Sequence, residues 1–197
     1  MSKTLLIVFV KNSIIGKVKT RLAKTIGDKS ALEVYNQLLD ITEKCVENVK
    51  ADKHIYFSEE VNNSRWVKGL KFVQEGENLG DRMFSAFLHG FNQGYEKVIL
   101  IGSDLPEISP EIIDAGFEAL NKNEVVFGPA QDGGYYLIGM TKPQRFIFEN
   151  KPWSEAGLLQ ITLEALGKQE VSFSLLQTLN DIDTFEDLKT SKLYSDA

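Results

Sequence analysis

The stretch Val98-Ile99-Leu100-Ile101-Gly102-Ser103-Asp104-Leu105-Pro106 decides the fold class of this chain. Its run of apolar residues, ended by a glycine, predicts a strand that is buried on both faces of a sheet. Asp104 follows the carboxyl end of that strand, at the edge where open α/β sheets bind their ligands. A carboxylate in this position is suited to hold Mg²⁺ on a nucleotide phosphate. Because Ser-Asp-x-Pro is equally good turn chemistry, a purely structural role for Asp104 stays open at this point.

The rest of the chain alternates short apolar runs with longer amphipathic stretches, which is typical of βα units in a mostly parallel sheet. We expect strands at Leu5–Val10, His54–Phe57, Lys71–Val73, Val98–Ile101, Val125–Gly128, Tyr135–Gly139 and Glu170–Phe173. We expect helices at Lys29–Val49, Arg82–Asn92, Pro110–Leu120, Glu155–Leu166 and Phe185–Leu193. The expected helix caps are Asp28, Ser109 and Thr184. A length of 197 residues without repeats or linker-like segments predicts a single α/β domain over residues 1–197.

The composition argues against several classes of protein. The formal net charge of −6 argues against a general nucleic-acid binder. The single cysteine, Cys45, permits no intramolecular disulfide, which is typical of a reducing compartment, and we expect it to be buried in a helix. The run Leu5–Val10 is too short to span a bilayer, so we expect no membrane contact and a cytoplasmic location. His54 and His89 have no partners at ligand spacing, which argues against a zinc site and predicts structural roles for both.

A cluster of basic residues follows the first expected strand. Its members are Lys11, Lys17, Lys19, Arg21 and Lys24, with no acidic residue between positions 11 and 24. In an extended segment Lys17, Lys19 and Arg21 would share one face, which suits a triphosphate or another phosphorylated ligand. Gly16 would let backbone amides approach the anion. A solvated basic loop remains the alternative, and the glycine spacing excludes a Walker A loop and a dinucleotide fingerprint.

Two glycine-bearing loops are further candidates for ligand binding. Gly80 lies near the start of an expected helix whose backbone amides would bind an anion, and Arg82 would assist. In the alternative interpretation Asp81 only caps that helix and Arg82 is exposed.

The second loop contains Asp132, Gly133, Gly134 and Tyr135 and permits a tight turn with close backbone approach to a ligand. A plain hairpin remains open, because Asp-Gly is a strong hairpin signal. If its strand is parallel to the one before Asp104, the turn lies at the same sheet edge, with Asp132 and Tyr135 over the pocket.

Two carboxylates precede the last expected helix. Asp181 and Asp183 are two residues apart and would face the same way in an extended segment, as a divalent-cation site requires. The alternative is electrostatic stabilisation of the helix N-terminus. A second carboxylate cluster far in sequence from Asp104 favours the metal site.

The motifs match those of a known family in their order. They are Lys11-x-x-x-x-Gly16-x-Val18-Lys19-Thr20-Arg21-Leu22, Gln74-x-Gly76-x-x-Leu79-Gly80-x-Arg82-Met83, Gly102-Ser103-Asp104-x-Pro106, Gly128-Pro129-Ala130-x-Asp132-Gly133-Gly134-Tyr135-Tyr136-Leu137-Ile138-Gly139, Trp153 and Asp181-Ile182-Asp183-Thr184. The chain thereby resembles the uncharacterised glycosyltransferase-A-like family of the nucleotide-diphospho-sugar transferase superfamily. More distantly it is similar to molybdenum-cofactor guanylyltransferase and 2-phospho-lactate guanylyltransferase. Ser13 and Ile15 stand where this family usually carries prolines, so the resemblance implies a less preorganised first loop.

The resemblance implies a three-layer α/β/α fold with a mostly parallel mixed sheet of about seven strands. It also implies a bound nucleoside triphosphate or nucleotide-sugar and a Mg²⁺ (or Mn²⁺) ion, with Asp104 as the main metal ligand and Asp183 as the second. Lys19 and Arg21 would hold the phosphates, and the loop Asp132–Tyr135 would shape the side of the small-molecule acceptor.

The leading functional hypothesis is nucleotidyl transfer, in which a phosphate or carboxylate of the acceptor attacks the α-phosphorus of the triphosphate and pyrophosphate leaves. This chemistry needs positioning and charge neutralisation more than a protein nucleophile. The candidate catalytic residues, which are aspartate, lysine and arginine, agree with that requirement. Glycosyl transfer from a nucleotide-sugar is the first alternative, since it needs the same fold, metal and cations. A nucleotide-binding module without catalysis is the second.

Overall fold

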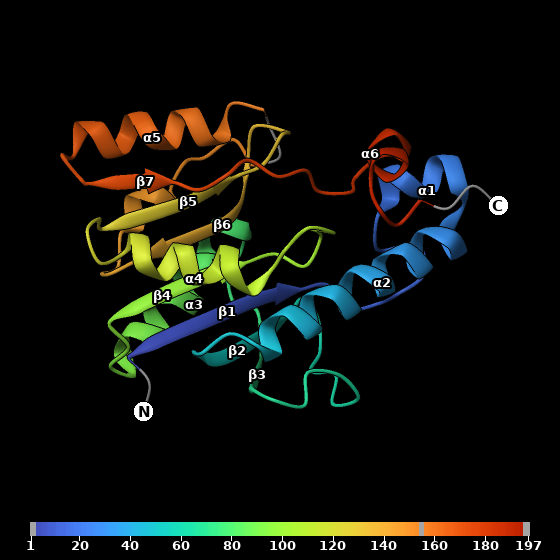
Figure 1. Cartoon of the computed structure of the whole chain (residues 1–197), viewed down its shortest axis with the longest axis horizontal. Helices are drawn as coiled ribbons and strands as arrows, with labels where there is room; N and C mark the ends of the chain where they lie inside the picture. The colour runs from blue at the N-terminus through green and yellow to red at the C-terminus, as the bar shows by residue number, and fades with distance from the viewer. Residues whose placement is uncertain (1–2, 154–155, 195–197) are drawn as a thin grey trace.

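The computed structural model describes residues 3–153 and 156–194, which form a sheet covered by helices on both faces (Figure 1). The sheet has seven strands in the order β3-β2-β1-β4-β6-β5-β7. The strands are β1 (Thr4–Val10), β2 (Asp52–Phe57), β3 (Leu70–Val73), β4 (Lys97–Ile101), β5 (Val125–Pro129), β6 (Tyr135–Met140) and β7 (Phe173–Leu175). Only β6 is antiparallel to its neighbours, β4 and β5, and every other pairing is parallel. The expected mostly parallel mixed sheet is confirmed.

Six α-helices and one short 3₁₀ helix are present in the described part of the chain. They are α1 (Thr20–Ile26), α2 (Asp28–Glu47), α3 (Leu79–Asn92), α4 (Pro110–Ala119), η1 (Arg145–Ile147), α5 (Leu158–Lys168) and α6 (Phe185–Thr190). Helices α2 and α4 pack on one face of the sheet, and α3, η1 and α5 pack on the other. The expected three-layer α/β/α architecture is therefore confirmed.

The strand sequences explain why both faces are covered. Successive residues of β1 alternate between the two cores, with Leu6 and Val8 on the α2 and α4 side and Leu5 and Ile7 on the α3 side, all with 0% exposure. Because side chains alternate along a strand, a continuous apolar run supplies both faces at once. Cys45 belongs to the first of these cores and is buried in α2 as expected.

A third cluster of buried residues lies beyond the carboxyl ends of the strands. It joins α1, the first half of α2 and α6 through Leu22, Ala31, Leu38, Ile182 and Leu188. In Figure 1 the arrow of β1 points toward this group, where α1 and α6 lie side by side. The cluster therefore brings the segment after β1 and the end of the described chain to the same edge of the sheet.

Several details differ from the sequence-based expectations. Helix α1 was not expected, because it is short and mostly polar and buries only Leu22. Helix α3 begins at Leu79 and is capped by Asn78, whose side chain accepts a hydrogen bond from the Asp81 backbone, so Asp81 lies in the first turn.

The predicted capping residue of α2 is also wrong, since Gly27 occupies that position and Asp28 begins the helix. The last strand lies later than predicted, at Phe173–Leu175, because Glu170 takes a left-handed conformation (φ 53°) that ends the preceding helix region. The capping box at Thr184 and Asp187 and the proline at the start of α4 are as predicted. The expected helix start at Glu155 lies outside the described residues.

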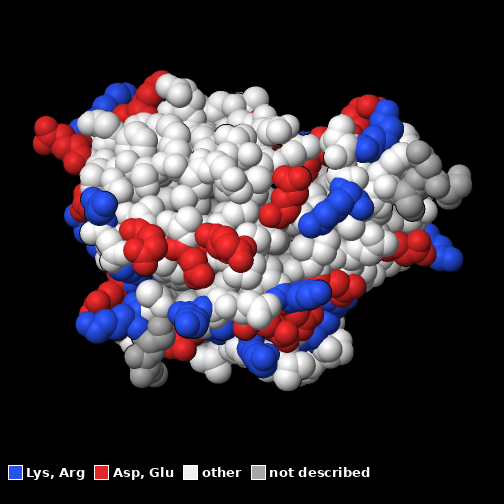
Figure 2. All heavy atoms as spheres, viewed as in Figure 1, with Lys and Arg blue, Asp and Glu red and all other residues white. Residues whose placement is uncertain are grey.

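The described helices include none that is long and apolar enough to cross a membrane. Basic and acidic side chains are both scattered over the face drawn in Figure 2, and a large part of that face carries neither.

Candidate active site

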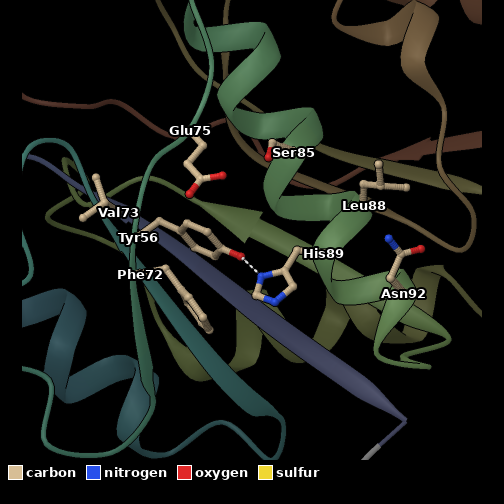
Figure 3. A pocket seen from close by; sticks show the side chains of 8 residues that line it. All are labelled: Tyr56, Phe72, Val73, Glu75, Ser85, Leu88, His89 and Asn92. Carbon is tan, nitrogen blue, oxygen red and sulfur yellow. Dashed lines mark hydrogen bonds between the residues drawn. The ribbon is translucent and has the colours of Figure 1, made fainter.

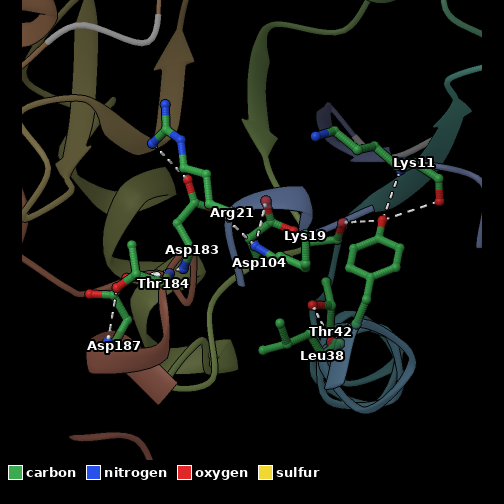
Figure 4. Close-up of polar contacts among 11 residues, drawn as sticks. Lys11, Lys19, Arg21, Leu38, Thr42, Asp104, Asp183, Thr184 and Asp187 are labelled. Atoms are coloured by element: carbon green, nitrogen blue, oxygen red, sulfur yellow. Dashed lines mark hydrogen bonds and ion pairs between the residues drawn. The ribbon is translucent and has the colours of Figure 1, made fainter. Parts of the chain in front are cut away.

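The side chain of Lys19 joins two carboxylates that are far apart in the sequence (Figure 4). Its Nζ lies 3.2 Å from Oδ2 of Asp104 and 3.2 Å from Oδ1 of Asp183. Asp104 follows β4, Asp183 precedes α6, and Lys19 comes directly before α1. Three candidates chosen from separate motifs therefore meet at the carboxyl edge of the sheet.

Lys19 is held in an unusual local conformation. It is the residue before the first turn of α1 and has a left-handed backbone (φ 48°, ψ 43°). Its side chain is 3% exposed, whereas those of Asp104 and Asp183 are 34% and 39% exposed. Burial alone lowers the pKa of the Lys19 ammonium, but the negative charges of Asp104 and Asp183 outweigh burial and raise this pKa above its usual value. Lys19 is therefore a buried cation that depends on its two acidic partners.

The other basic residues of this segment do not share one face. Because α1 begins at Thr20, Arg21 is helical, and its Nη1 lies 3.5 Å from Oδ2 of Asp183. Lys17 is exposed and pairs with Glu59, at 3.1 Å. The extended conformation expected for residues 17–21 is therefore wrong.

Lys11 and Gly16 lie in the same loop. Lys11, Lys17, Lys19 and Arg21 still line one hollow of about 180 Å³, here called the basic hollow, together with Thr20, Tyr35, Asp104 and Asp183. Gly16 has φ +76°, a conformation that suits glycine, and it does not line this hollow.

Tyr35, on α2, connects two loops of the site. Its hydroxyl accepts a hydrogen bond from the backbone N–H of Lys11 (2.9 Å) and donates one to the Lys11 carbonyl (3.1 Å). The same oxygen lies 3.2 Å from Oγ of Ser103, the residue before Asp104. Tyr35 is 1% exposed. Tyr35 was not predicted as a site residue, because its position in the sequence marks it only as a residue of a helix.

The position of Asp183 is fixed by its own neighbourhood. Oδ2 of Asp187 accepts hydrogen bonds from the backbone N–H groups of Asp183 (3.2 Å) and Thr184 (2.7 Å). The backbone N–H of Ile182 donates to the Asp104 carbonyl (3.3 Å), so the two acidic segments are joined directly. The alternative role considered for Asp181 and Asp183 was electrostatic stabilisation of the α6 N-terminus. In this structure Asp187, in the first turn of α6, has that role.

A second hollow of about 260 Å³ adjoins the basic hollow and shares Asp104 with it. We call it the acidic cleft, because Asp104, Asp132 and Asp181 line it. Its other lining residues are Leu79, Met83, Gly102, Leu105, Ala130, Gly134, Tyr135, Tyr136, Trp153 and Leu158. The predicted position of the loop Asp132–Tyr135, at the same edge as Asp104, is confirmed because β5 and β4 run in the same direction.

The turn that carries Asp132 is rigidly built. Oδ1 of Asp132 accepts a hydrogen bond from the backbone N–H of Gly134 (2.8 Å). Gly133 has φ +90°, and a Cβ there would lie 1.9 Å from the Ala156 carbonyl oxygen. The Gly133 carbonyl accepts a hydrogen bond from Leu159 at the start of α5 (3.0 Å). Gly133 therefore shapes the cleft by letting the segment before α5 pack against the turn.

Asp181 has an altered acidity. Burial, and then the negative charges of Asp183 and Asp132, raise the pKa of its carboxyl to about 6. The positive charge of Lys19 opposes this shift only in part. The acidic cleft is therefore a region where additional negative charge is disfavoured.

Gly80 and Arg82 are placed differently from the other candidates. A Cβ at Gly80 would lie 2.5 Å from the Phe148 carbonyl oxygen and 2.7 Å from the Trp153 ring. The Nε of Arg82 donates to the Gly76 carbonyl (3.2 Å). Neither residue lines the basic hollow or the acidic cleft, so the structure gives Gly80 a packing role and joins Arg82 to its own loop.

The carboxylates of the site are candidate ligands for a divalent cation. In residues 3–153 and 156–194 no group of three or more His, Cys, Asp or Glu side chains could hold a metal ion. Asp104 and Asp183 nevertheless direct oxygens toward one cation, the Lys19 ammonium. Oxygen donors of this kind fit Mg²⁺, which usually takes one or two carboxylates and completes its shell with phosphates and water.

A separate groove lies between β2, β3 and α3 (Figure 3). It has a volume of about 430 Å³ and shares no lining residue with the basic hollow or the acidic cleft. His89 lines it and forms a 2.7 Å hydrogen bond to the Tyr56 hydroxyl. His54 is 1% exposed, and its ring centroid is 5.6 Å from that of His89.

The sheet order, the layers and the similarity to a solved structure define the class: the chain has the nucleotide-diphospho-sugar transferase fold. Its residues 41–155 match the family described as "Uncharacterized protein conserved in bacteria (DUF2064)", and the chain belongs to this family. It is 30% identical to a protein of Desulfovibrio desulfuricans G20 that is provisionally named a nucleotide-diphospho-sugar transferase. That similarity has a TM-score of 0.88 and covers 98% of this chain and 93% of the other.

Two more distant structures share the fold. The inositol-1-phosphate CTP transferase of T. maritima is 15% identical, with a TM-score of 0.60 over 94% of this chain and 91% of the other. Rv0371c of Mycobacterium tuberculosis H37Rv, in complex with manganese, is 10% identical, with a TM-score of 0.55 over 95% and 97%. No curated protein matches this chain.

Proposed function

We propose that this protein is a nucleotidyltransferase that transfers a nucleoside monophosphate from a triphosphate to a small-molecule acceptor and releases pyrophosphate. The observation that carries the proposal is the buried Lys19 ammonium between Asp104 and Asp183, beside a hollow lined by Lys11, Lys17 and Arg21. The transferase class expected from the sequence agrees with the names of the relatives from D. desulfuricans and T. maritima.

The basic side chains would bind the triphosphate. Lys19 and Arg21 would neutralise its phosphates, and Lys11 extends the positive charge along the hollow. Positively charged groups that are already in place stabilise the charge that develops on the leaving pyrophosphate. Gly16 lies in the loop between these cations but does not line the hollow, so its role would be to shape that loop. Gly80 and Arg82, which lie outside the hollow, are not part of this proposal.

Asp104 and Asp183 would hold a divalent cation, Mg²⁺ or Mn²⁺, with Asp181 two residues away. The complex of Rv0371c with manganese supports the use of such an ion in this fold. Bound there, the ion would supply Lewis-acid stabilisation of the phosphate oxygens. In this structure the Lys19 ammonium neutralises the same two carboxylates. Binding of a metal ion by Asp104 and Asp183 would therefore change the interactions of Lys19. The described residues that line the basic hollow would bind and orient the phosphates, and the attacking nucleophile would come from the acceptor.

The acceptor would occupy the acidic cleft. This cleft meets the basic hollow at Asp104, so a molecule bound in it would lie next to the phosphates. The turn formed by Asp132, Gly133, Gly134 and Tyr135 would position it, as expected from the sequence. Holding both reactants in one geometry supplies much of the rate enhancement in such a reaction.

Glycosyl transfer from a nucleotide-sugar is the second candidate function. It is favoured by the provisional name of the relative that is 30% identical. The same cations would neutralise the leaving nucleoside diphosphate, and the same cleft would hold the acceptor. A cytoplasmic location and the more distant similarity to two guanylyltransferases stay predictions from the sequence.

The test is a thermal-shift panel of the four nucleoside triphosphates and common nucleotide-sugars, each with and without Mg²⁺. A ligand present at a hundred times its Kd stabilises the folded state by about 2.7 kcal/mol, which such a panel detects. Mg²⁺-dependent stabilisation by one triphosphate supports nucleotidyl transfer and identifies the base. Stabilisation chiefly by a nucleotide-sugar favours glycosyl transfer, and no stabilisation by any compound contradicts both.

A further inference from the structure

The charges that line the acidic cleft all have the same sign. Its titratable carboxyl groups are those of Asp104, Asp132 and Asp181, and no Lys, Arg or His is among the described residues that line it. Asp104 has its counter-charge in Lys19, which lies in the adjoining basic hollow. Asp132 and Asp181 form no ion pair with any described residue. Asp104 and Asp181 lie near the Lys19 ammonium and the proposed metal ion, whereas Asp132 has no cation of its own. A phosphate or carboxylate bound beside Asp132 would therefore meet an uncompensated negative charge.

Many of the other residues that line the cleft are apolar. Trp153 and Tyr135 provide aromatic rings, and Leu79, Met83 and Leu158 provide aliphatic side chains. The Trp153 ring packs against Gly80 at the start of α3, where no other residue would leave it room. The Tyr135 ring packs edge-on against Phe127, with centroids 5.2 Å apart. Such walls suit the apolar face of a ring-shaped molecule, while the carboxylates accept hydrogen bonds from its edge.

We infer that the acceptor is an uncharged, hydroxyl-bearing molecule of the sugar or polyol class, and that its nucleophile is a hydroxyl group. This inference rests on the proposed function. It replaces the phosphorylated or carboxylate acceptor expected from the sequence. Hydroxyl groups donate hydrogen bonds to the carboxylates, so they satisfy the charges that would repel an anion.

The proposed chemical step needs an attacking hydroxyl, a leaving pyrophosphate and an acceptor for the hydroxyl proton. The hydroxyl oxygen attacks the α-phosphorus of the triphosphate, the new P–O bond forms, and the bond to the departing pyrophosphate breaks. The hydroxyl proton passes to the carboxylate of Asp132. Oδ1 of that carboxylate already accepts a hydrogen bond from Gly134, whereas Oδ2 has no hydrogen-bond partner among the described residues. Asp132 is therefore positioned as an acceptor of one proton.

The experiment compares matched pairs of acceptors. Glucose, inositol and glycerol are each tested against their monophosphates, with the triphosphate that stabilises the protein and Mg²⁺, and pyrophosphate release is measured. We expect at least one neutral compound to exceed its monophosphate by about tenfold or more in kcat/KM. The Asp132→Asn variant should lose activity toward the neutral compound, because the proton acceptor is removed. The ratio of kcat/KM for the neutral compound to kcat/KM for its monophosphate should also fall, because one negative charge is removed from the cleft. Asp114→Asn, the same change at an exposed position of α4 outside the cleft, is the matched control.

Binding is measured separately through the fluorescence of Trp153, in a Trp66→Phe background because Trp66 is buried elsewhere (2% exposed). Neutral compounds should change the emission at lower concentrations than their monophosphates. Preference for the monophosphates, or no response to any neutral compound, overturns the inference. Loss of triphosphate binding in Asp132→Asn would place the base in the cleft and also overturn it. Absence of stabilisation by any nucleotide would instead contradict the proposed function, while the fluorescence comparison would still report on the cleft.

Discussion

The Lys19 ammonium lies 3.2 Å from Oδ2 of Asp104, although the two residues come from loops that follow different strands of the sheet. Lys19 makes an equally short contact with Asp183, so one buried cation serves two partly exposed carboxylates. A buried lysine without partners would lose its proton or destabilise the fold. The carboxylates therefore keep Lys19 charged at the position where the proposed function places the phosphates. Substitution of the lysine and of each carboxylate tests this relationship.

Replacing Lys19 with methionine should weaken triphosphate binding more than it weakens the fold. We expect the loss of the buried cation to cost roughly 2 kcal/mol in binding, or about thirtyfold in Kd. Stability should fall by roughly 1–2 kcal/mol, because the two carboxylates stay partly in water and are repelled only weakly. Isothermal titration and urea unfolding measure the two effects. Lys24→Met, at an exposed position in the last turn of α1, should change neither, and an unchanged Kd in Lys19→Met would contradict the phosphate role.

Replacing Asp104 with asparagine should remove the Mg²⁺-dependent part of nucleotide binding and leave the protein folded. The Asp104 side chain is 34% exposed, but it pairs with the buried Lys19 ammonium, which keeps Asp183 as its second partner. We therefore expect the unfolding free energy to fall by roughly 1–2 kcal/mol without loss of the fold. Asp183→Asn should behave in the same way. Thermal shifts with and without Mg²⁺ separate the metal-dependent contribution from the rest. If either folded variant binds nucleotide normally with Mg²⁺, that residue is not a metal ligand.

Replacing Tyr35 with phenylalanine tests the connection between the basic loop and the Asp104 loop. The substitution removes the hydrogen bonds of one buried hydroxyl to Lys11 and Ser103, which should cost about 1–2 kcal/mol of stability. Because both loops become less constrained, we also expect a severalfold weaker Kd for the triphosphate. Tyr95→Phe is the matched control, since its hydroxyl bonds only Asp52, at 3.0 Å. An equal effect of both variants on nucleotide binding would show that Tyr35 acts only through stability.

The sequence predicted the sheet well because its strands are apolar runs whose two faces are both buried. The runs Leu5–Val10 and Val98–Ile101 lie within β1 and β4 almost residue for residue. The strand predicted at 170–173 was displaced because β7 is a three-residue strand with a half-exposed pattern. Helix α1 was not predicted, because its sequence has no clear apolar periodicity. Packing against α2 and α6 stabilises it instead.

The structure brings together some of the predicted site residues, but not Gly16, Gly80 or Arg82, and the contacts among them were not predicted. The motifs supplied Lys19, Asp104 and Asp183, yet they assigned the lysine to phosphate and the aspartates to metal. The ion pairs among them depend on long-range packing that no local pattern encodes. Tyr35 was missed for the same reason, since periodicity shows that a residue is buried but not where its hydroxyl points. Gly80 fitted an anion-binding interpretation because a glycine needed for packing has the same sequence signal.

Replacing Gly80 with alanine distinguishes packing from anion binding. Alanine is favoured over glycine in a helix by up to about 1 kcal/mol, but its Cβ would lie 2.5 Å from the Phe148 carbonyl oxygen. We therefore expect a net loss of about 1–3 kcal/mol and a changed emission of Trp153. Gly167→Ala in α5, where a Cβ meets nothing within 4 Å, should instead be neutral or stabilising. A stable Gly80→Ala protein with weaker nucleotide binding would restore the anion-binding role.

His54 should give the protein a measurable loss of stability in acid. Burial, and then the charge of His89, lower the pKa of its imidazole from 6.5 to about 4, and neither ring nitrogen has a hydrogen-bond partner. The unfolded chain therefore binds the extra proton first as pH falls. Neutral His54 contributes fully to the free energy of unfolding above pH 6.5, and this contribution is lost as the pH falls toward 4. The loss over that interval is roughly 2–3 kcal/mol.

The His54→Phe variant tests this assignment, because Phe fits among the rings of Phe72 and Tyr95 and cannot be protonated. Urea unfolding at about pH 7 and about pH 5 should show a smaller loss of stability in the variant than in the wild type, by about 2 kcal/mol. His89 is present in both proteins, so the difference between them belongs to His54. Equal losses in the two proteins would mean that His54 is not the group whose protonation destabilises the fold.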